Sequence, residues 1–381
     1  MTHERHESAA PELDRTAHHA GRSALRGHDA HIPGWPSGAV GGGHRGVGPA
    51  GHGSFPHRTQ ARNGRPGLGR PNRPAESLTA LEAESSLYRT ACQPGVRLKQ
   101  RHQEVVVVLD TSSVMVETLL GSLRVRRAGT GAPALLWHSL FVDSSTFDGI
   151  LPDLGAQREL VVIDGPGHGD SPGPRRRYTL EDCAAAAIQI LDAVQIPGPV
   201  DWVGNAWGGH VGIVFAHNYP SRCRTLTTIG TPPYPLTESE RRQNALLVYL
   251  YRVVGPRPFS RIMVEALAGK GVATSAPQAA AVVKAAFMAG DKPGKYWAMQ
   301  SVMMHRPDLR PVLPRLQVPV LMLAGRDDEL LDAAEAERAA LSAPDGRFGR
   351  VTGAGHVAPL LVAPHEVTER VLAFWSGRGS F

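Results

Sequence analysis

The chain has few of the features that mark secreted, metal-binding or membrane-spanning proteins. Its 381 residues include only three cysteines, Cys92, Cys183 and Cys223, and these share no metal-ligand spacing. No apolar stretch resembling a signal peptide lies near the N-terminus, and the best candidate for a membrane span, residues 105–120, is interrupted by two acidic residues. We therefore expect a cytoplasmic protein with reduced thiols, no metal and no membrane association.

Excess charge is also scarce outside the N-terminal part of the chain. The formal net charge is +6, and residues 1–80 carry ten arginines against six acidic residues, which leaves +4 of the total in that segment. The rest of the chain is close to neutral. This balance does not indicate a nucleic-acid-binding surface, so no nucleic-acid partner is expected.

The N-terminal segment is poor in apolar side chains. Gly, Pro, Arg and His supply 41 of residues 1–80, including nine of the 17 histidines, at irregular spacing. Such a composition cannot bury enough apolar surface to offset the entropy lost on ordering. We expect a disordered extension over residues 1–114. The abrupt change in composition also suggests the hypothesis that this segment is an upstream extension of the reading frame, with translation starting near Met115.

From about residue 116 onward, short apolar runs alternate with segments of helical pattern. Continuous apolar strands separated by helices predict an α/β fold, in which a mostly parallel sheet is covered by helices on both faces. Right-handed crossovers place the loops that follow the strands along one edge, where a ligand site is expected. Strands are expected at 122–129, 132–139, 160–165, 200–204, 226–230, 318–325 and 346–353, and helices near 179–194, 207–219, 332–342 and 365–376.

One stretch, residues 233–312, interrupts this alternation. It contains no convincing strand and carries helical patterns at 238–254 and 276–290. Because it leaves directly after the end of a predicted strand, we expect a helical cap over the sheet edge, inserted in a domain that spans residues 115–381. Extra helices packed on the core are the alternative interpretation.

The segment "VDWVGNAWGGHVGIVFAH" at 200–217 joins a predicted strand to a helix of small residues through a glycine-rich corner. Residues 204–208 read Gly-Asn-Ala-Trp-Gly and are followed by Gly209. This fits the pattern G-x-nucleophile-x-G, except that Ala206 stands at the apex. Glycines flank such an apex because the turn is strained and the strand and helix approach too closely for Cβ atoms.

Together with four further segments, this corner resembles the α/β-hydrolase superfamily over residues 120 to 378. The chain order of nucleophile position, acid and histidine fits that superfamily. The resemblance implies a hydrolase of small, apolar, ester-like carbonyl compounds that uses no cofactor or metal. The segments are 135–147, which resembles the strand before the oxyanion-hole loop; 160–174, a strand and loop common in the superfamily; 318–332, the strand ending in the acid; and 350–361, the histidine loop.

The resemblance also implies roles for individual residues. Ala206 occupies the nucleophile position, His356 is the histidine, and Asp328 is the acid, with Asp327 as the less favoured choice. The backbone N–H groups of Leu140 and Trp207 would form the oxyanion hole. Read without the resemblance, His356 would be a surface-loop histidine and Asp328 a helix N-cap.

Other polar residues near these motifs are given structural roles. His138 and His210 are expected to orient or pack their own segments, and Asp164 and Asp170 to order the loop that carries them. Trp207 is expected to form a wall of the pocket. Haloalkane dehalogenases of the same superfamily suggest a second hypothesis, because a tryptophan after their Asp nucleophile holds halide; here Ala206 replaces that Asp.

Alanine cannot form a covalent intermediate, which leaves three hypotheses open. In the first, Ala206 is natural and the His356–Asp328 pair acts as a general base on water or on a substrate proton, in a hydrolase, lyase or isomerase. In the second, the protein binds a small ligand without catalysis. In the third, Ala206 is an engineered replacement of serine in an esterase or C–C bond hydrolase. Each implies a small-molecule substrate or ligand, and none indicates the oligomeric state.

Overall fold

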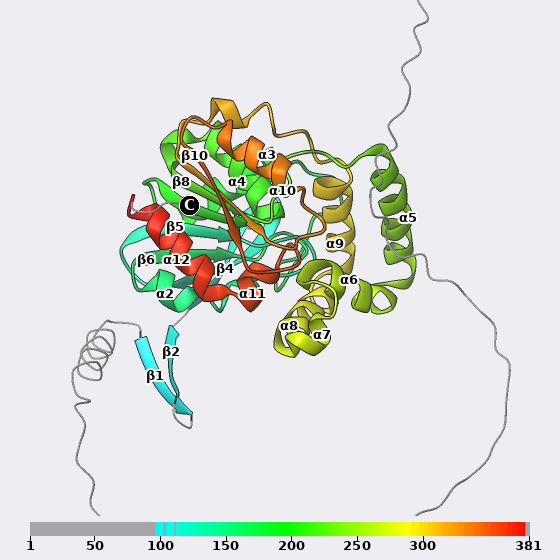
Figure 1. The fold of residues 1–381 in the computed structure, drawn as a ribbon, viewed down its shortest axis with the longest axis horizontal. Helices are drawn as coiled ribbons and strands as arrows, with labels where there is room; N and C mark the ends of the chain where they lie inside the picture. The colour runs from blue at the N-terminus through cyan, green and yellow to red at the C-terminus, as the bar shows by residue number, and fades with distance from the viewer. Residues whose placement is uncertain (1–95, 102–103, 110–111, 378–381) are drawn as a thin grey trace, which may run out of the picture. The chain divides into compact units, whose positions relative to one another are not determined.

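The structure, a computed structural model, describes residues 96–101, 104–109 and 112–377 (Figure 1). Residues 1–95, where we expect disorder, lie outside this range, as does Cys92. All seven strands expected from the sequence are present, each within a few residues of its expected bounds. The strands are β1 (Val96–Arg101), β2 (Glu104–Leu109), β3 (Ser112–Thr118), β4 (Gly121–Ala128), β5 (Ala132–Trp137), β6 (Arg158–Ile163), β7 (Val200–Asn205), β8 (Cys223–Ile229), β9 (Val320–Gly325) and β10 (Gly346–Val351).

Eight of these strands form one sheet, in the order β10-β9-β8-β7-β5-β6-β4-β3. The strands from β10 to β6 pair in parallel, whereas β4 and β3 are antiparallel additions at one edge. The predicted mostly parallel sheet is therefore confirmed. Because β5 lies between β6 and β7, the strand order reverses there, and ligands of open α/β sheets bind outside the strand ends at such a point.

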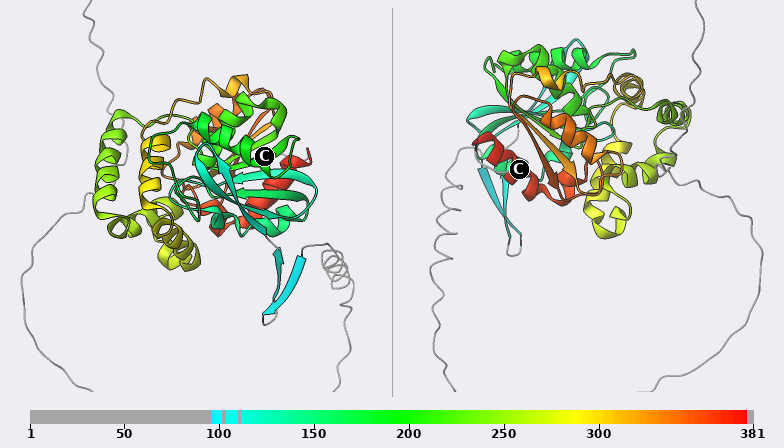
Figure 2. Two further views of the ribbon diagram at one scale, coloured as in Figure 1. Left: turned by 180° about the vertical axis from the view of Figure 1, so that it is seen from behind. Right: turned by 45° about the horizontal axis from the view of Figure 1, so that its top comes forward.

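Helices cover both faces of this sheet, as the sequence predicts (Figure 2). Along β5, Leu135 and Trp137 point into one hydrophobic cluster with α3, α4 and α10, while Ala134 and Leu136 point into another with α2 and α12. This alternation follows from the two-residue period of a strand. The helices are α2 (Leu151–Gly155), α3 (Leu180–Ala193), α4 (Trp207–Asn218), α10 (Ala333–Leu341), α11 (Ala358–Val362) and α12 (Pro364–Trp375), with short 3₁₀ turns η1 (Ser144–Phe147) and η2 (Pro220–Arg222).

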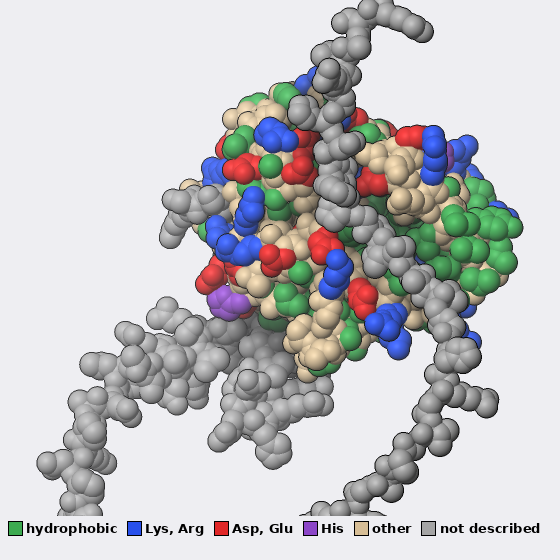
Figure 3. Space-filling view, turned by 45° about the vertical axis from the view of Figure 1, so that its right-hand side comes forward, with side chains coloured by type: hydrophobic (Ala, Val, Ile, Leu, Met, Phe, Trp, Pro, Cys, Tyr) green, Lys and Arg blue, Asp and Glu red, His purple; other side chains and the backbone are tan. Residues whose placement is uncertain are grey.

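Residues 233–312 lie between β8 and β9 and contain helices and loops but no strand. We call this segment the cap. One face of its first helix, α5, is apolar and exposed, which gives the hydrophobic patch in Figure 3; the exposed side chains are Leu246, Tyr249, Leu250, Val253 and Val254. The helices are α5 (Glu238–Val254), α6 (Ser260–Ala268), α7 (Val272–Ser275), α8 (Pro277–Met288) and α9 (Lys292–Ala298), with η3 (Arg257–Phe259) and a π-helical segment η4 (Met299–Met303); η5 (Leu313–Arg315) follows the cap.

The cap is attached to the loop that follows β6. The Gly173 N–H donates to Asp291 Oδ2 at 3.0 Å, and Arg175 pairs with the same carboxylate at 2.5 Å. Gly167 lies so close to the backbone of Gly294 that a Cβ at either position would overlap the other segment. The cap therefore meets the core at backbone distance on this side.

The described chain begins earlier than the sequence suggests. β1 and β2 form an antiparallel pair with Val96 opposite Leu109, and β3 begins at Ser112. β1, β2 and the first residues of β3 fall within residues 1–114, where we expect no stable structure. A run of β-branched valines at 105–108 accounts for the difference, because such residues favour strands over disorder. Among the residues that the structure describes, no helix is long and apolar enough to cross a membrane.

Candidate active site

The glycine-rich corner forms a tight turn between β7 and α4. Ala206 at its apex has φ 45° and ψ −99°, a conformation that L-residues seldom adopt. Such backbone strain costs about 1–3 kcal/mol and persists only where neighbours impose it. Here the Ala206 N–H donates to the Ile229 carbonyl at 2.8 Å, and the Ala206 carbonyl accepts from the His210 N–H at 3.0 Å. The turn that presents a nucleophile in such folds is thus formed around an alanine.

The flanking glycines permit this turn because the strand and helix backbones almost touch. A Cβ on Gly204 would overlap the carbonyl of Gly208, and a Cβ on Gly208 would overlap the carbonyl oxygen of Trp137 at the end of β5. Neither neighbour is a flexible side chain that could move aside. The G-x-x-x-G spacing is therefore required by contact between backbones.

The structure brings Asp328 and His356 together. His356 Nδ1–H donates to Asp328 Oδ2 at 2.7 Å, and the side chains are 1% exposed for Asp328 and 14% for His356. Asp328 follows β9 and His356 lies in the loop after β10, so both belong to the edge where the parallel strands end. Asp327, the alternative acid, is exposed, and its carboxylate has no hydrogen bond to a described residue.

Asp328 is held as a carboxylate. Burial by itself raises the pKa of this group, but the charge and hydrogen bond of His356 and the backbone N–H groups of Leu330 and Leu331 lower the pKa below its ordinary value overall. The Leu330 N–H donates to Asp328 Oδ1 at 2.9 Å. An ionised, hydrogen-bonded aspartate fixes the ring orientation of its histidine and leaves Nε2 as the free nitrogen for proton transfer.

Asn205, which precedes the apex, connects the turn to the histidine loop. Its Nδ2 donates to the carbonyls of Ile229 at 2.9 Å and His356 at 2.7 Å. We assigned this residue no role from the sequence. The available signal was an amide side chain at the buried carboxyl end of a strand, where polar groups need partners.

Two backbone N–H groups near the turn have no protein acceptor. Within the described residues, neither Leu140 N nor Trp207 N donates a hydrogen bond. The loop that carries Leu140 is joined to α4, because the Gly208 N–H donates to the His138 carbonyl at 3.1 Å. Phe141, with φ 74°, gives the loop its sharp turn and donates from its N–H to His168 Nε2 at 3.1 Å. The two N–H groups that we expect to form the oxyanion hole are therefore left without an acceptor among the described residues.

Buried polar side chains hold the loops after β5 and β6 together. His138 Nε2 accepts from the Gly165 N–H at 2.8 Å, and Asp164 Oδ1 accepts from the Ser144 N–H at 2.9 Å. Burial lowers the pKa of both His138 and His168, so that both act as neutral acceptors. His138 and Asp164 thus have structural surroundings, whereas His168 was not identified from the sequence.

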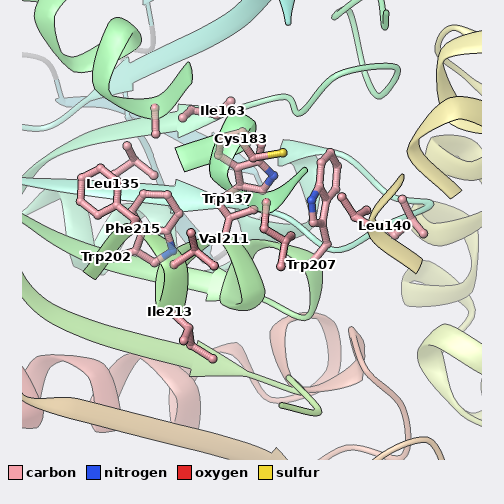
Figure 4. Packing of buried hydrophobic residues seen from close by; sticks show 14 of the residues in the cluster. Leu135, Trp137, Leu140, Ile163, Cys183, Trp202, Trp207, Val211, Ile213 and Phe215 are labelled. Atoms are coloured by element: carbon pink, nitrogen blue, oxygen red, sulfur yellow. The ribbon is translucent and has the colours of Figure 1, made fainter. Parts of the chain in front are cut away.

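The Trp207 ring lies in the core beneath these loops (Figure 4). It is 2% exposed and packs edge-on against Trp137, with ring centroids 5.5 Å apart, and against His138 and His168 at 5.7 and 5.3 Å. Little of its surface remains for a ligand, which differs from the expectation of a pocket wall. The ring supports the loop that carries Leu140.

The remaining candidates have separate surroundings. His210 Nε2–H donates to the Pro232 carbonyl at 2.8 Å, Asp170 is exposed beside Arg124, and Cys183 and Cys223 are buried free thiols. Among the described residues, no three His, Cys, Asp or Glu side chains are grouped so that they could hold a metal ion.

Comparison with known proteins agrees with this geometry. A family model described as the alpha/beta hydrolase fold matches residues 132–361. The chain is 26% identical over 243 residues to a poly(3-hydroxyalkanoate) depolymerase of Ectopseudomonas oleovorans, covering 60% of this chain and 83% of that protein. It is 27% identical over 246 residues to a 2-(acetamidomethylene)succinate hydrolase of Mesorhizobium japonicum, covering 62% and 85%. A solved esterase of Thermogutta terrifontis has a TM-score of 0.64 at 24% identity, covering 70% and 98%.

Proposed function

Because the chain belongs to the α/β-hydrolase fold family, we propose that it hydrolyses small carbonyl compounds of the ester class, using water directly instead of a covalent enzyme intermediate. Two relatives are named as a depolymerase of a hydroxyalkanoate polyester and as a hydrolase, which supports hydrolytic chemistry. The observation that carries the proposal is the hydrogen bond between His356 and Asp328 at 2.7 Å, present although Ala206 offers no nucleophile.

The proposed reaction proceeds in two steps. His356 Nε2 takes a proton from water as the hydroxide attacks the carbonyl carbon, while Asp328 holds Nδ1–H and stabilises the imidazolium. The oxygen that becomes negative accepts hydrogen bonds from the N–H groups of Leu140 and Trp207. The imidazolium then returns the proton to the leaving alkoxide as the C–O bond breaks, so that the carboxylic acid and the alcohol are released.

The absence of a nucleophile predicts a slow enzyme. Removing the serine of a hydrolase triad costs about 10⁶ in kcat, while the oxyanion hole and binding keep about 10³–10⁴ over the uncatalysed reaction. Turnover should therefore be measurable with activated esters, and without a burst phase, because no acyl-enzyme can accumulate.

Activity of single variants tests this proposal. The purified protein should hydrolyse 4-nitrophenyl acetate or butyrate above the buffer rate, and both His356→Ala and Asp328→Asn should reduce this activity to background or close to it. His365→Ala is the matched control, since His365 is exposed on α12 with a side chain that is 81% accessible. Activity absent from the parent protein, or unchanged in His356→Ala, would contradict the proposal.

Ala206 itself favours a second candidate function, a ligand-binding protein without catalysis. In that case a bound carbonyl compound would use the same two N–H groups, and its affinity would be indifferent to His356 and Asp328. Calorimetric titration of the parent and the His356→Ala variant with a non-hydrolysable ketone analogue separates the two functions.

A further inference from the structure

The cap carries an arginine, Arg306, in a segment that packs against the loop after β8. Arg306 follows the last helical segment of the cap, in a stretch that is fixed at both ends. The Met304 carbonyl accepts from Arg241 Nη1 at 2.7 Å, and the Leu309 N–H donates to the Pro233 carbonyl at 2.8 Å. Arg306 therefore lies between the start of α5 and the loop that follows β8, which is the loop that runs past the turn at Ala206.

The Arg306 guanidinium has no carboxylate partner in contact among the described residues. Its Nε is buried and has no acceptor, and no carboxylate oxygen of the described residues lies within 4.0 Å of its nitrogens. Other arginines that are partly buried contrast with this: Arg158 pairs with Asp201 at 2.8 Å, and Arg126 with Asp148 at 2.8 Å. Arg306 is partly buried, and the Nε–H is the part of its guanidinium that is fully buried. A buried donor without an acceptor costs free energy, which a bound anion would recover.

Glu240, an acidic group of the cap whose charge acts on Arg306, is already hydrogen-bonded elsewhere. The charge of Glu240 acts on Arg306, but Glu240 Oε2 accepts from the N–H and hydroxyl of Thr237, at 2.7 and 2.8 Å, in the capping box of α5. Burial lowers the pKa of Arg306 to about 10, which still leaves the guanidinium charged at neutral pH. The side chain thus stays cationic without an internal counter-ion in contact.

The neighbours of Arg306 connect it to the candidate active site. The Pro232 carbonyl, one residue before Pro233, accepts from His210 Nε2–H at 2.8 Å. His210 lies one helical turn after Ala206, and the Tyr234 hydroxyl accepts from the Asp332 N–H at 2.9 Å. The segment that carries Arg306 therefore packs against the loop at 232–234, and that loop contacts both the helix after the turn and the segment after Asp328.

We propose that Arg306 is a binding site for a carboxylate group on the substrate. This inference rests on the proposed function and names its substrate class: an ester or lactone whose otherwise apolar body carries one carboxylate away from the scissile bond. The planar guanidinium can donate two parallel N–H hydrogen bonds to one carboxylate. Because it is weakly hydrated, it loses little hydration free energy on binding. Such a contact also places the scissile carbonyl relative to His356, since both ends of the substrate are then held.

Binding of matched esters tests this site without requiring turnover. The full chain is titrated by calorimetry with the monomethyl esters of glutaric, adipic and suberic acid and with the corresponding dimethyl esters. The wild-type protein should bind at least one monoester about tenfold or more tightly than its diester, because a hydrogen bond to a charged group is worth that much in affinity. The Arg306→Gln variant should lose this preference, and Arg306→Lys should retain part of it.

Arg257→Gln is the matched control, because Arg257 is an exposed cap arginine whose side chain has no hydrogen-bonding partner among the described residues. Equal affinity of wild-type protein for monoesters and diesters, or no binding of either, would overturn the subsite even if Arg306→Gln failed to fold. A preference that survives in folded Arg306→Gln would overturn it as well. Carboxylate-dependent binding without any hydrolysis would instead contradict the proposed function and leave the subsite standing.

Discussion

The sheet edge and the cap contribute to the candidate site in different ways. At the edge, Ala206, Asp328 and His356 are positioned by hydrogen bonds and backbone contacts between neighbouring strands and loops. The cap packs on the core through apolar side chains, such as Phe287 against Phe141, and through polar contacts such as Gly173 with Asp291, while the outer face of α5 is apolar and exposed (Figure 3). The comparison suggests that the edge determines the chemistry, whereas the cap selects the molecule on which the chemistry acts.

Restoring a nucleophile at the edge should give the largest effect. In Ala206→Ser the added hydroxyl occupies an apex whose neighbours already accommodate the strained turn, so little overpacking is expected. With His356 as its base, the serine should raise hydrolysis of activated short-chain esters about a thousandfold or more, with a burst that reports an acyl-enzyme. Stopped-flow measurement of 4-nitrophenol release tests both the rate and the burst.

The double variant Ala206→Ser with His356→Ala is the control, and it should lose the gain. Suppose that Ala206→Ser folds normally and still cleaves no activated ester. The edge would then lack a competent oxyanion hole or histidine pair, and Ser139 would be the first suspect, because it replaces the usual glycine before Leu140. The ligand-binding function would in that case be favoured over the enzyme.

A Cβ at the turn should give the next largest effect, on stability. Gly208→Ala places a methyl group against the carbonyl oxygen of Trp137, where only a movement of α4 away from β5 can make room. We expect a loss of about 3 kcal/mol or more in the free energy of unfolding. Gly198→Ala is the matched control, since a Cβ there meets no atom within 4 Å, and it should change stability by less than about 0.5 kcal/mol. Urea denaturation of the two variants provides the comparison, and equal losses would contradict it.

The edge was largely predictable from the sequence, and physical reasons explain why. Apolar runs such as 200–205 have to be buried on both faces, which indicates a parallel sheet, and the glycines at 204 and 208 indicate backbones in contact. The order of Ala206, Asp328 and His356 along the chain then places all three at the same edge. Each of these signals can be read from a short stretch of sequence, and each limits the folds that are compatible with the others.

The cap offered weaker signals. Helical patterns predict its helices but not which faces meet the core, because that depends on contacts between segments far apart in the chain, such as Gly173 with Asp291. Arg306 and Tyr234 belong to no motif, and their neighbourhood arises only when the segment after η4 is laid against the loop after β8. Asn205 and His168 were missed for the same reason, since their partners are backbone groups of other loops.

The smallest expected effect concerns the packing of α9 on the end of α8, within the cap, and depends on pH. Lys295 is fully buried, and its ammonium donates to the carbonyls of Ala286, Phe287 and Ala289 at the end of α8, at 2.7, 3.1 and 2.7 Å. Burial lowers the pKa of Lys295 from 10.5 to about 8. Above pH 8 the unfolded chain therefore keeps a proton that the folded chain has begun to release.

Because the unfolded state then binds more protons, the contribution of Lys295 to the free energy of unfolding rises with pH, by about 1 kcal/mol between pH 7 and 9. Lys295→Met removes this titration, so the stability difference between wild-type and variant protein should move in favour of wild type over that interval, in denaturation series at both pH values. Lys284→Met, at an exposed position on α8, should show no such change. If the two variants respond alike, the three carbonyls hold the proton on Lys295 beyond pH 9, and α8 and α9 are joined by a permanent charge. If only Lys295→Met responds, the packing of α9 on α8 is weaker at lower pH, whereas the edge, whose Asp328 is ionised throughout, does not change.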